Sequence, residues 1–255
     1  MCELLGMSAN VPTDIVFSFT GLMRRGGETG PHRDGWGIGF YEGRGLRLFQ
    51  DPQASADSEV ARLVQRYPVK STAVIGHIRQ ANVGAVSLAN THPFVREMWG
   101  RYWCFAHNGQ LADFAPAPGF YQPVGDTDSE AAFCDLLNRL RGAFASMPDV
   151  DGLLPLLVAA CDEYRSKGVF NCLLSNGDWL FSYCTTKLAC ITRRAPFGPA
   201  TLKDAELTVN FQAETTPDDV VSVIATEPLT DNEQWHRYQP GQWILWRRGE
   251  VLAQG

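Results

Sequence analysis

The sequence has no excess of basic residues and no long apolar run. Its 255 residues carry a net charge of -6, which argues against a surface that binds nucleic acid. The best apolar stretch, Leu153 to Cys161, contains Pro155 and is far shorter than the roughly 20 residues that a membrane-spanning helix needs. The N-terminus lacks a basic segment followed by an apolar core, so no secretory signal is expected. The sequence therefore predicts a soluble, cytoplasmic protein.

Cys-x-x-Cys pairs are also absent, and no group of His and Cys has the spacing of a zinc site. An odd count of seven cysteines at irregular spacing indicates reduced thiols. Apart from Cys2, the cysteines occur mainly in apolar runs, where they are expected to be small core residues. We therefore expect no metal and no other cofactor.

The composition, with 45% hydrophobic and 20% charged residues, is that of a globular protein. The length allows one domain over residues 1–255. Strand signals dominate and often occur as adjacent hairpins. They fall at 36–40, 46–49, 72–78, 102–106, 169–174, 179–184, 188–192, 207–211, 220–225 and 243–246. Adjacent hairpins favour antiparallel sheets covered by helices over a doubly wound parallel fold.

Helical spacing of apolar residues predicts helices over about 14–23, 59–65, 131–144 and 151–167. Ser58 is expected to cap the second helix and to turn Val60, Leu63 and Val64 inward. Before the third helix, the segment 127–130 has the pattern of a capping box. The long loops 24–34 and 80–100 are candidate functional segments, because long loops in compact domains are often functional.

Cys2 follows the initiator methionine, and removal of Met1 would leave a residue with both a thiol and a free α-amine. The thiolate is the attacking species in cysteine chemistry, and an α-amine can accept a proton near neutral pH. Such a residue carries its own nucleophile and base. The alternative is a small residue that follows the start codon by chance.

Three further segments carry polar groups suited to an amide substrate. Arg79 follows a predicted strand in Gly76-His77-Ile78-Arg79 and can bind a carboxylate with two hydrogen bonds, or can be an ordinary surface arginine. The side chain of Asn108 and the N–H of Gly109 can stabilise an oxyanion, or can form a hairpin turn. Asp128 can hold an ammonium group, or can stabilise the start of a helix.

His92 lies inside the second long loop, in the segment Asn90-Thr91-His92-Pro93. Its imidazole can act as a general base or can order the loop. We favour the ordering role, because the α-amine of Cys2 already supplies a base.

Together and in order, these segments resemble the class II glutamine amidotransferases, which are N-terminal-nucleophile amidohydrolases. The likeness runs from Cys2 to about Phe144 and is greatest to the stand-alone, YafJ-like branch. It is carried by the opening Met-Cys-Glu-Leu-Leu-Gly, by Asp34-Gly35-Trp36-Gly37 and by the segments 76–79, 90–93, 107–109 and 127–130.

The resemblance implies a fold and a mechanism. The fold is α+β, a four-layer αββα sandwich of antiparallel sheets. Cys2 would attack the side-chain amide of glutamine, and its α-amine would pass the thiol proton to the leaving ammonia. Asn108 and Gly109 would form the oxyanion hole. Arg79, with His77 beside it, would bind the substrate carboxylate, and Asp128 would bind the substrate ammonium.

The sequence departs from relatives that are fused to a synthase, which usually have Trp, Ala, Thr and His after the motif arginine. Here Gln80-Ala81-Asn82-Val83 follows Arg79, which puts coupling to ammonia transfer in doubt. Three functions stay open: a subunit that delivers ammonia to a separate synthase, a free-standing hydrolase of glutamine or γ-glutamyl amides, and a non-catalytic glutamine-binding module. The acceptor is not predicted.

Overall fold

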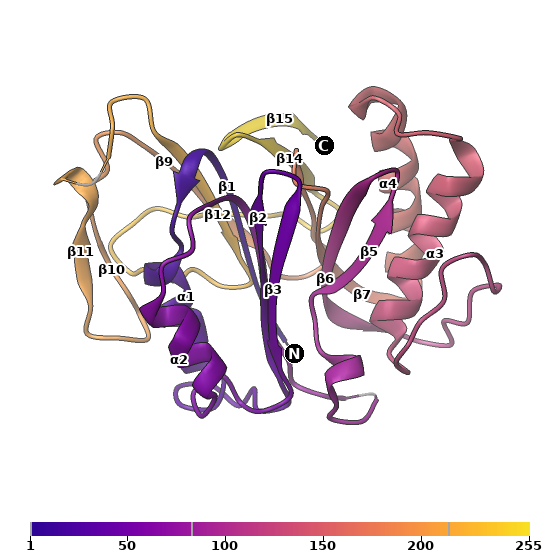
Figure 1. Ribbon diagram of the computed structural model, residues 1–255, viewed down its shortest axis with the longest axis horizontal. Helices are drawn as coiled ribbons and strands as arrows, with labels where there is room; N and C mark the ends of the chain where they lie inside the picture. The colour runs from indigo at the N-terminus through magenta and orange to yellow at the C-terminus, as the bar shows by residue number, and fades with distance from the viewer. Residues whose placement is uncertain (1, 83, 214) are drawn as a thin grey trace.

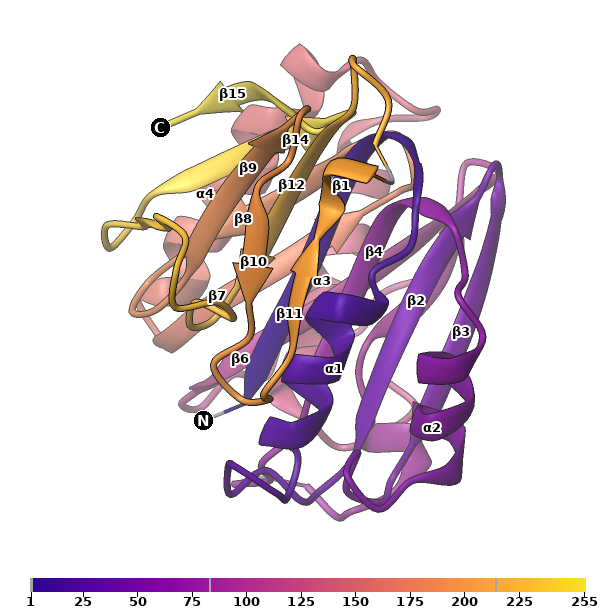
Figure 2. The same cartoon turned by 90° about the vertical axis from the view of Figure 1, so that its left-hand side faces the viewer.

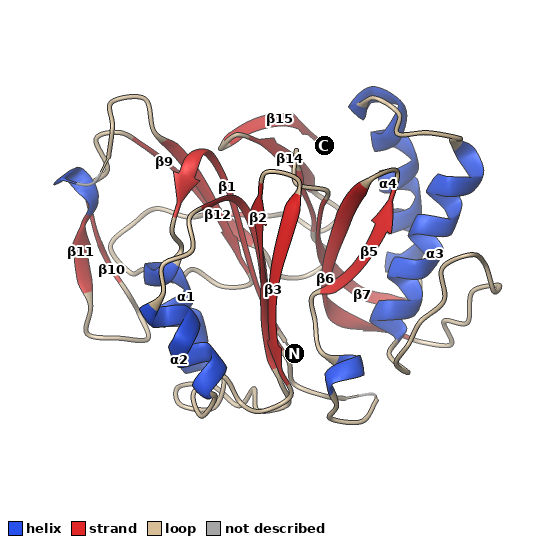
Figure 3. Ribbon diagram, in the orientation of Figure 1, coloured by secondary structure: helices blue, strands red, loops and turns tan. Residues whose placement is uncertain are grey.

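The computed structural model describes residues 2–82, 84–213 and 215–255. Its core is a pair of antiparallel sheets that pack face to face, with helices on both outer faces (Figure 1; Figure 3). The order of layers is therefore α, β, β, α, and the expected four-layer sandwich is confirmed.

Within the described residues the first sheet has seven strands. In spatial order they are β13 (His236–Arg237), β9 (Ala189–Arg194), β12 (Val220–Ala225), β1 (Glu3–Thr13), β4 (Ser71–Ile78), β2 (Trp36–Glu42) and β3 (Gly45–Asp51). The central strand, β1, pairs with β12 on one side and with β4 on the other. The sequence pattern did not predict β1, which is the strand that follows Cys2.

The second sheet has six strands. Their order is β15 (Glu250–Gln254), β14 (Trp243–Arg247), β8 (Leu180–Tyr183), β7 (Gly168–Ser175), β6 (Arg101–Leu111) and β5 (Phe94–Met98). The predicted hairpin around Gly177 joins β7 to β8 and is confirmed. The predicted turn at Asn108-Gly109 is wrong, because β6 continues to Leu111 and both residues pair with β7.

The second sheet is covered by α3 (Asp128–Ala143) and α4 (Val150–Arg165). The helix α3 begins at Asp128, three residues before the predicted start, because the hydroxyl of Thr127 accepts from the N–H of Glu130. Only this half of the expected capping box forms. The carboxylate of Glu130 instead accepts from the Gly125 N–H and pairs with Arg96, which fixes the loop that leads into α3.

The first sheet is covered by α1 (Val16–Arg25), α2 (Glu59–Arg66) and a two-stranded ribbon of β10 (Pro199–Thr201) and β11 (Thr208–Asn210). Figure 2 shows these elements in front of the sheet. Two short 3-10 helices, η1 (Leu88–Asn90) and η2 (Phe211–Ala213), complete the described elements. Ser58 caps α2 as predicted, but Leu63 is exposed and Ala61 is buried in its place.

Three clusters of buried side chains follow these layers. One lies between the second sheet and α3 and α4, one between the first sheet and its outer layer, and one between the two sheets. Leu4 of β1 belongs to the cluster between the sheets, while its neighbour Leu5 belongs to the outer cluster. The start of β1 is therefore held on both faces, and this fixes the position of Cys2.

Candidate active site

Residues far apart in the sequence meet in a small cleft at the end of the two sheets where the chain begins. Its volume is about 30 Å³. The cleft is lined by Cys2 before β1, the segment 79–82 after β4, His92, part of β6, and the segment 127–129 at the start of α3. Cys2, Arg79, Gly109 and Asp128, all predicted site residues, thus share one cleft.

The thiol of Cys2 rests against the backbone that follows Arg79. Its Sγ accepts from the N–H of Gln80 at 3.4 Å and lies 3.5 Å from the carbonyl oxygen of Gln80. Burial raises the pKa of the Cys2 thiol above its ordinary value, and the Gln80 N–H and the charge of Arg79 act in the opposite direction. A base is therefore needed to form the thiolate. The predicted removal of Met1 concerns a residue outside the described ones.

The guanidinium of Arg79 is buried and donates to carbonyl oxygens of the loop that follows it. Its Nη1 lies 3.0 Å from the oxygen of Ala85, and its Nη2 lies 3.1 Å from that of Gly84. This loop is also fixed from the opposite side, because Asn90 hydrogen bonds to Ala85 and to Asp126. The cation thus ties Gly84 and Ala85 to the end of β4.

Asp128 is the first residue of α3, and its carboxylate joins that helix to β6. One oxygen accepts from the Leu111 N–H at 2.6 Å, and the other accepts from the Ser129 N–H at 2.9 Å. Each carboxylate oxygen has a second acceptor site, so the group remains able to accept from a ligand. The cleft therefore has a cation on one wall and a carboxylate on another.

Asn108 is fully buried and does not line the cleft. Its Nδ2 lies 3.2 Å from the hydroxyl oxygen of Thr226, and its Oδ1 has no hydrogen-bond partner in the part of the chain that the structure describes. The same hydroxyl oxygen accepts from the N–H of Leu4, two residues after the thiol. Thr226, which no sequence motif marked, therefore connects Asn108 to the strand that carries Cys2.

Gly109 lies in a place that no other residue can occupy. A Cβ atom there would overlap the carbonyl oxygen of Val169 on β7 and would come within 2.7 Å of Nε2 of His107. The backbone of β6 therefore approaches β7 and the ring of His107 more closely than a side chain permits. Packing is therefore enough to require a glycine here, whether or not its N–H also acts as the oxyanion donor that the sequence suggested.

Three histidines are packed behind and beside the thiol. His77 is fully buried, donates from Nε2 to the His107 carbonyl at 3.1 Å, and stacks on His92 at 4.1 Å between ring centroids. His77 is not among the residues that line the cleft, so a direct contact with substrate stays a prediction. Its observed neighbours indicate that it supports His92, which does line the cleft.

Burial keeps these rings neutral. It lowers the pKa of His77 to about 3 and lowers those of His92 and His107 below the ordinary histidine value. Neither nitrogen of His92 has a hydrogen-bond partner among the described residues, so the ring orders its loop through no hydrogen bond to them. Asn90 has that role instead.

The other long loop, 24–34, also reaches the site. Arg25 donates from Nη1 to the carboxylate of Glu3 at 3.1 Å and from Nε to Asp204 at 2.8 Å. Asp34 accepts from the N–H of Ala81 at 2.7 Å. This loop therefore holds both the residue after the thiol and the segment that follows Arg79.

No helix in the part of the chain that the structure describes has the length and the apolar composition to cross a membrane. This part of the chain also contains no group of three or more His, Cys, Asp or Glu side chains arranged to hold a metal ion.

Comparison with known proteins places the chain in a family. The sequence model for glutamine amidotransferases of class II matches residues 1–255. The Escherichia coli K12 protein YafJ, which has glutamine amidotransferase in its name, is 58% identical over 255 residues, covering 99% of this chain and 100% of that protein. A Haemophilus influenzae protein with glutamine amidotransferase in its name is 44% identical and is covered over 87% of its length.

Solved structures agree. A predicted glutamine amidotransferase from Pseudomonas aeruginosa PA01 is 75% identical, with a TM-score of 0.82, covering 99% of this chain and all of that one. The glutamine phosphoribosylpyrophosphate amidotransferase of Bacillus subtilis, 14% identical, shares the fold with a TM-score of 0.62, and the likeness spans 49% of its chain. The chain belongs to the class II glutamine amidotransferases.

Proposed function

We propose that the protein hydrolyses the γ-amide of glutamine or of a γ-glutamyl compound, with Cys2 as the nucleophile. One observation carries this proposal: the thiol, a buried guanidinium and a carboxylate line the same cleft, although they come from three separate elements. A zwitterionic amino acid carries an α-carboxylate that the guanidinium can bind and an α-ammonium that the carboxylate of the cleft can bind. Binding both charges leaves the amide of its side chain to reach the thiol.

Arg79 binds the substrate carboxylate in this proposal, and Asp128 binds the ammonium. The cleft of about 30 Å³ is smaller than a glutamine molecule, so Gly84 and Ala85 have to move away from Arg79 before the substrate enters. The carboxylate then replaces the carbonyl oxygens of Gly84 and Ala85 as the acceptor for Arg79. A charged acceptor forms a stronger hydrogen bond to a guanidinium than a carbonyl does, which favours this exchange.

The proton steps balance when Met1 is removed. The free α-amine of Cys2 takes the thiol proton, directly or through a water, and the thiolate attacks the carbonyl carbon of the side-chain amide. The resulting ammonium gives the proton to the departing nitrogen, so ammonia or an amine leaves and a γ-glutamyl thioester remains. Water then attacks the thioester, the thiol is restored and the γ-carboxylate is released.

The negative oxygen of the tetrahedral intermediate needs donors, and Asn108 and Gly109 are the candidates. Rotation of the Asn108 amide by half a turn would let the Thr226 hydroxyl donate to Oδ1. That rotation satisfies an oxygen that has no partner in the observed orientation. It also releases Nδ2 from Thr226, so that the amide can donate to the oxyanion together with the N–H of Gly109.

The test combines mass measurement with a substrate screen of the full-length protein. We expect the purified protein to lack Met1 and to gain one adduct at Cys2 after treatment with the glutamine analogue 6-diazo-5-oxo-L-norleucine. Replacement of another cysteine, Cys190→Ala, is the matched control and should leave that adduct unchanged. A fully active protein that retains Met1 would contradict the mechanism.

The same screen shows whether the released ammonia or amine leaves into solution or is passed to a synthase. Turnover of glutamine or γ-glutamyl amides by the isolated protein identifies a free-standing hydrolase. Turnover that appears only with a copurifying synthase identifies an ammonia-delivering subunit. If no adduct forms and no substrate is hydrolysed, the proposal is wrong and a glutamine-binding module remains.

A further inference from the structure

A second and much larger cavity lies on the outer face of the first sheet. Its volume is about 560 Å³, and it shares no lining residue with the cleft around Cys2. It lies between α1 and the segment that carries the ribbon β10–β11, over β1 and β12.

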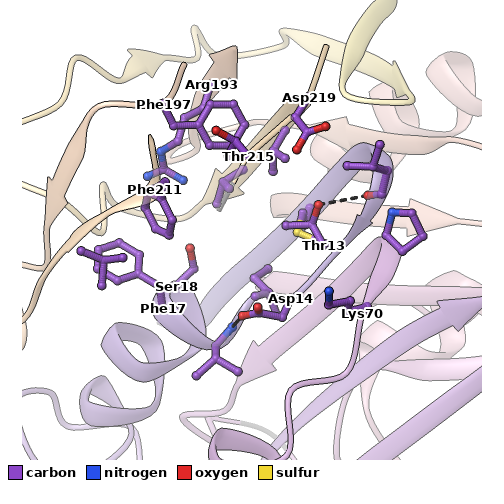
Figure 4. Close-up of a pocket in the computed structure, with 18 of the residues that line it drawn as sticks. Thr13, Asp14, Phe17, Ser18, Lys70, Arg193, Phe197, Phe211, Thr215 and Asp219 are labelled. Carbon is purple, nitrogen blue, oxygen red and sulfur yellow. Dashed lines mark hydrogen bonds between the residues drawn. The ribbon is translucent and has the colours of Figure 1, made fainter. Parts of the chain in front are cut away.

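The interior of the cavity is apolar and partly aromatic. Met7 of β1 and Val223 of β12 lie opposite each other in the ladder and form the floor. Phe17 and Phe211 meet edge to face at 5.2 Å between centroids, and Phe197 lies beside Phe211 (Figure 4). Small-molecule sites usually enclose about 300–1,000 Å³ with such a lining, and aromatic walls suit a bulky apolar group.

Among the described residues, four charged side chains line the cavity, and two of them are already engaged. Arg193 forms two hydrogen bonds with Glu233, at 2.7 and 2.6 Å. The carboxylate of Asp219 accepts from the backbone N–H and the hydroxyl of Thr216. Neither group is therefore the first choice for a ligand.

The remaining two charges, Asp14 and Lys70, lie at the same side of the cavity (Figure 4). One oxygen of Asp14 accepts from the Val16 N–H at 3.1 Å. Lys70 is exposed and forms no hydrogen bond or ion pair with any residue that the structure describes. Thr13 pairs with Ser71 between β1 and β4, so their neighbours Asp14 and Lys70 lie close together, and no ion pair joins them.

We propose that this cavity binds a free α-amino acid with a large apolar side chain. The ligand carboxylate binds Lys70, its ammonium binds Asp14, and its side chain packs against the phenylalanines. Both charges of the ligand then meet an opposite charge, and its apolar part leaves water. The proposal is independent of the reaction at Cys2.

Calorimetric titration of the full-length protein with L-phenylalanine tests the ligand class. We expect binding at millimolar concentration or below. Phenethylamine, which lacks the carboxylate, and 3-phenylpropionate, which lacks the ammonium, should bind at least about tenfold more weakly, because each loses one charged hydrogen bond. Absence of binding by L-phenylalanine, or equal binding of the three compounds, would overturn the proposal.

Variants test the place of binding. Lys70→Gln should weaken binding about tenfold, and Asp14→Asn should do the same while the amide still accepts from the helix N–H. Val209→Trp, which fills the cavity from β11, should abolish binding. Lys167→Gln, at an exposed lysine in the turn between α4 and β7, is the matched control and should change nothing.

Arg79→Ala distinguishes this cavity from the cleft. Binding of L-phenylalanine should persist in that variant. Loss of binding in Arg79→Ala together with normal binding in Lys70→Gln would place the ligand in the cleft and refute the second site. If Val209→Trp does not fold, Lys70→Gln and Asp14→Asn still decide the question.

Discussion

The cleft around Cys2 and the cavity on the outer face are built in opposite ways. In the cleft, strand ends and a helix start bring polar groups together, and backbone hydrogen bonds hold Arg79 and Asp128 in place. In the cavity, apolar side chains of the outer layer form the walls, and two charges lie at one side. The first arrangement suits chemistry that needs fixed geometry, and the second suits adaptable binding.

The sharpest test of this difference compares Cys2→Ala with Val209→Trp. Removal of the nucleophile should reduce amide hydrolysis by at least about a thousandfold, as in enzymes that lose a nucleophile. Filling the cavity should leave hydrolysis within about twofold, because no residue of the cavity lines the cleft. Steady-state kinetics on glutamine measure both. Full activity of Cys2→Ala would exclude the mechanism.

Two glycines extend the comparison to stability. Gly109→Ala should destabilise the protein by about 3 kcal/mol or more, because the new Cβ overlaps the Val169 carbonyl oxygen. Gly198→Ala, beside the ribbon, should change the free energy of unfolding by less than about 0.5 kcal/mol, since no heavy atom lies within 4 Å of its Cβ. Denaturant unfolding measures both. Equal effects would contradict the tight contact between β6 and β7.

Arg79 tests whether the ionic groups of the cleft hold the substrate. Arg79→Ala should raise KM for glutamine by about tenfold to a hundredfold, which corresponds to about 1.5–3 kcal/mol for a charged hydrogen bond. The value of kcat should fall less. Arg79→Lys should recover only part of the loss, because a lysine cannot donate in two-pronged geometry. An unchanged KM in Arg79→Ala would argue against this role.

The buried histidines predict a pH dependence of stability. Their folded pKa values are depressed, to about 3 for His77, so the unfolded chain takes up protons first as the pH falls below about 6.5. Stability is therefore lost as the pH falls from about 6.5 toward 3, by up to about 1.4 kcal/mol per pH unit for each histidine that stays neutral.

Denaturant unfolding between pH 7.5 and 5 measures how the free energy of unfolding changes with pH. This range lies above the pH at which most carboxylates titrate. His92→Phe keeps an aromatic ring against Phe94 and removes one titrating group, so the slope should decrease. His236→Gln, at an exposed position, should leave the slope unchanged. A slope that responds to both variants alike would show that burial is not its cause.

Several predictions from the sequence failed because the tertiary environment outweighs local pattern. β1 is buried on both faces over its first seven residues, so it lacks the alternation that marks a half-buried strand. Asn108-Gly109 has the composition of a turn, yet β7 pairs with it as continuous strand. Leu63 matches the apolar period of α2 but lies at an exposed edge.

The sequence by itself determined the chemistry of the candidate site. Cys2, Arg79 and Asp128 stood out because a thiol, a guanidinium and a carboxylate have distinct reactivities and occurred in recognisable segments. The tertiary structure decided what surrounds them: Thr226 beside Asn108, Gln80 against the thiol, and the outer cavity between α1 and the ribbon. Those contacts join residues far apart in the chain, and only the packing of the layers brings such residues together.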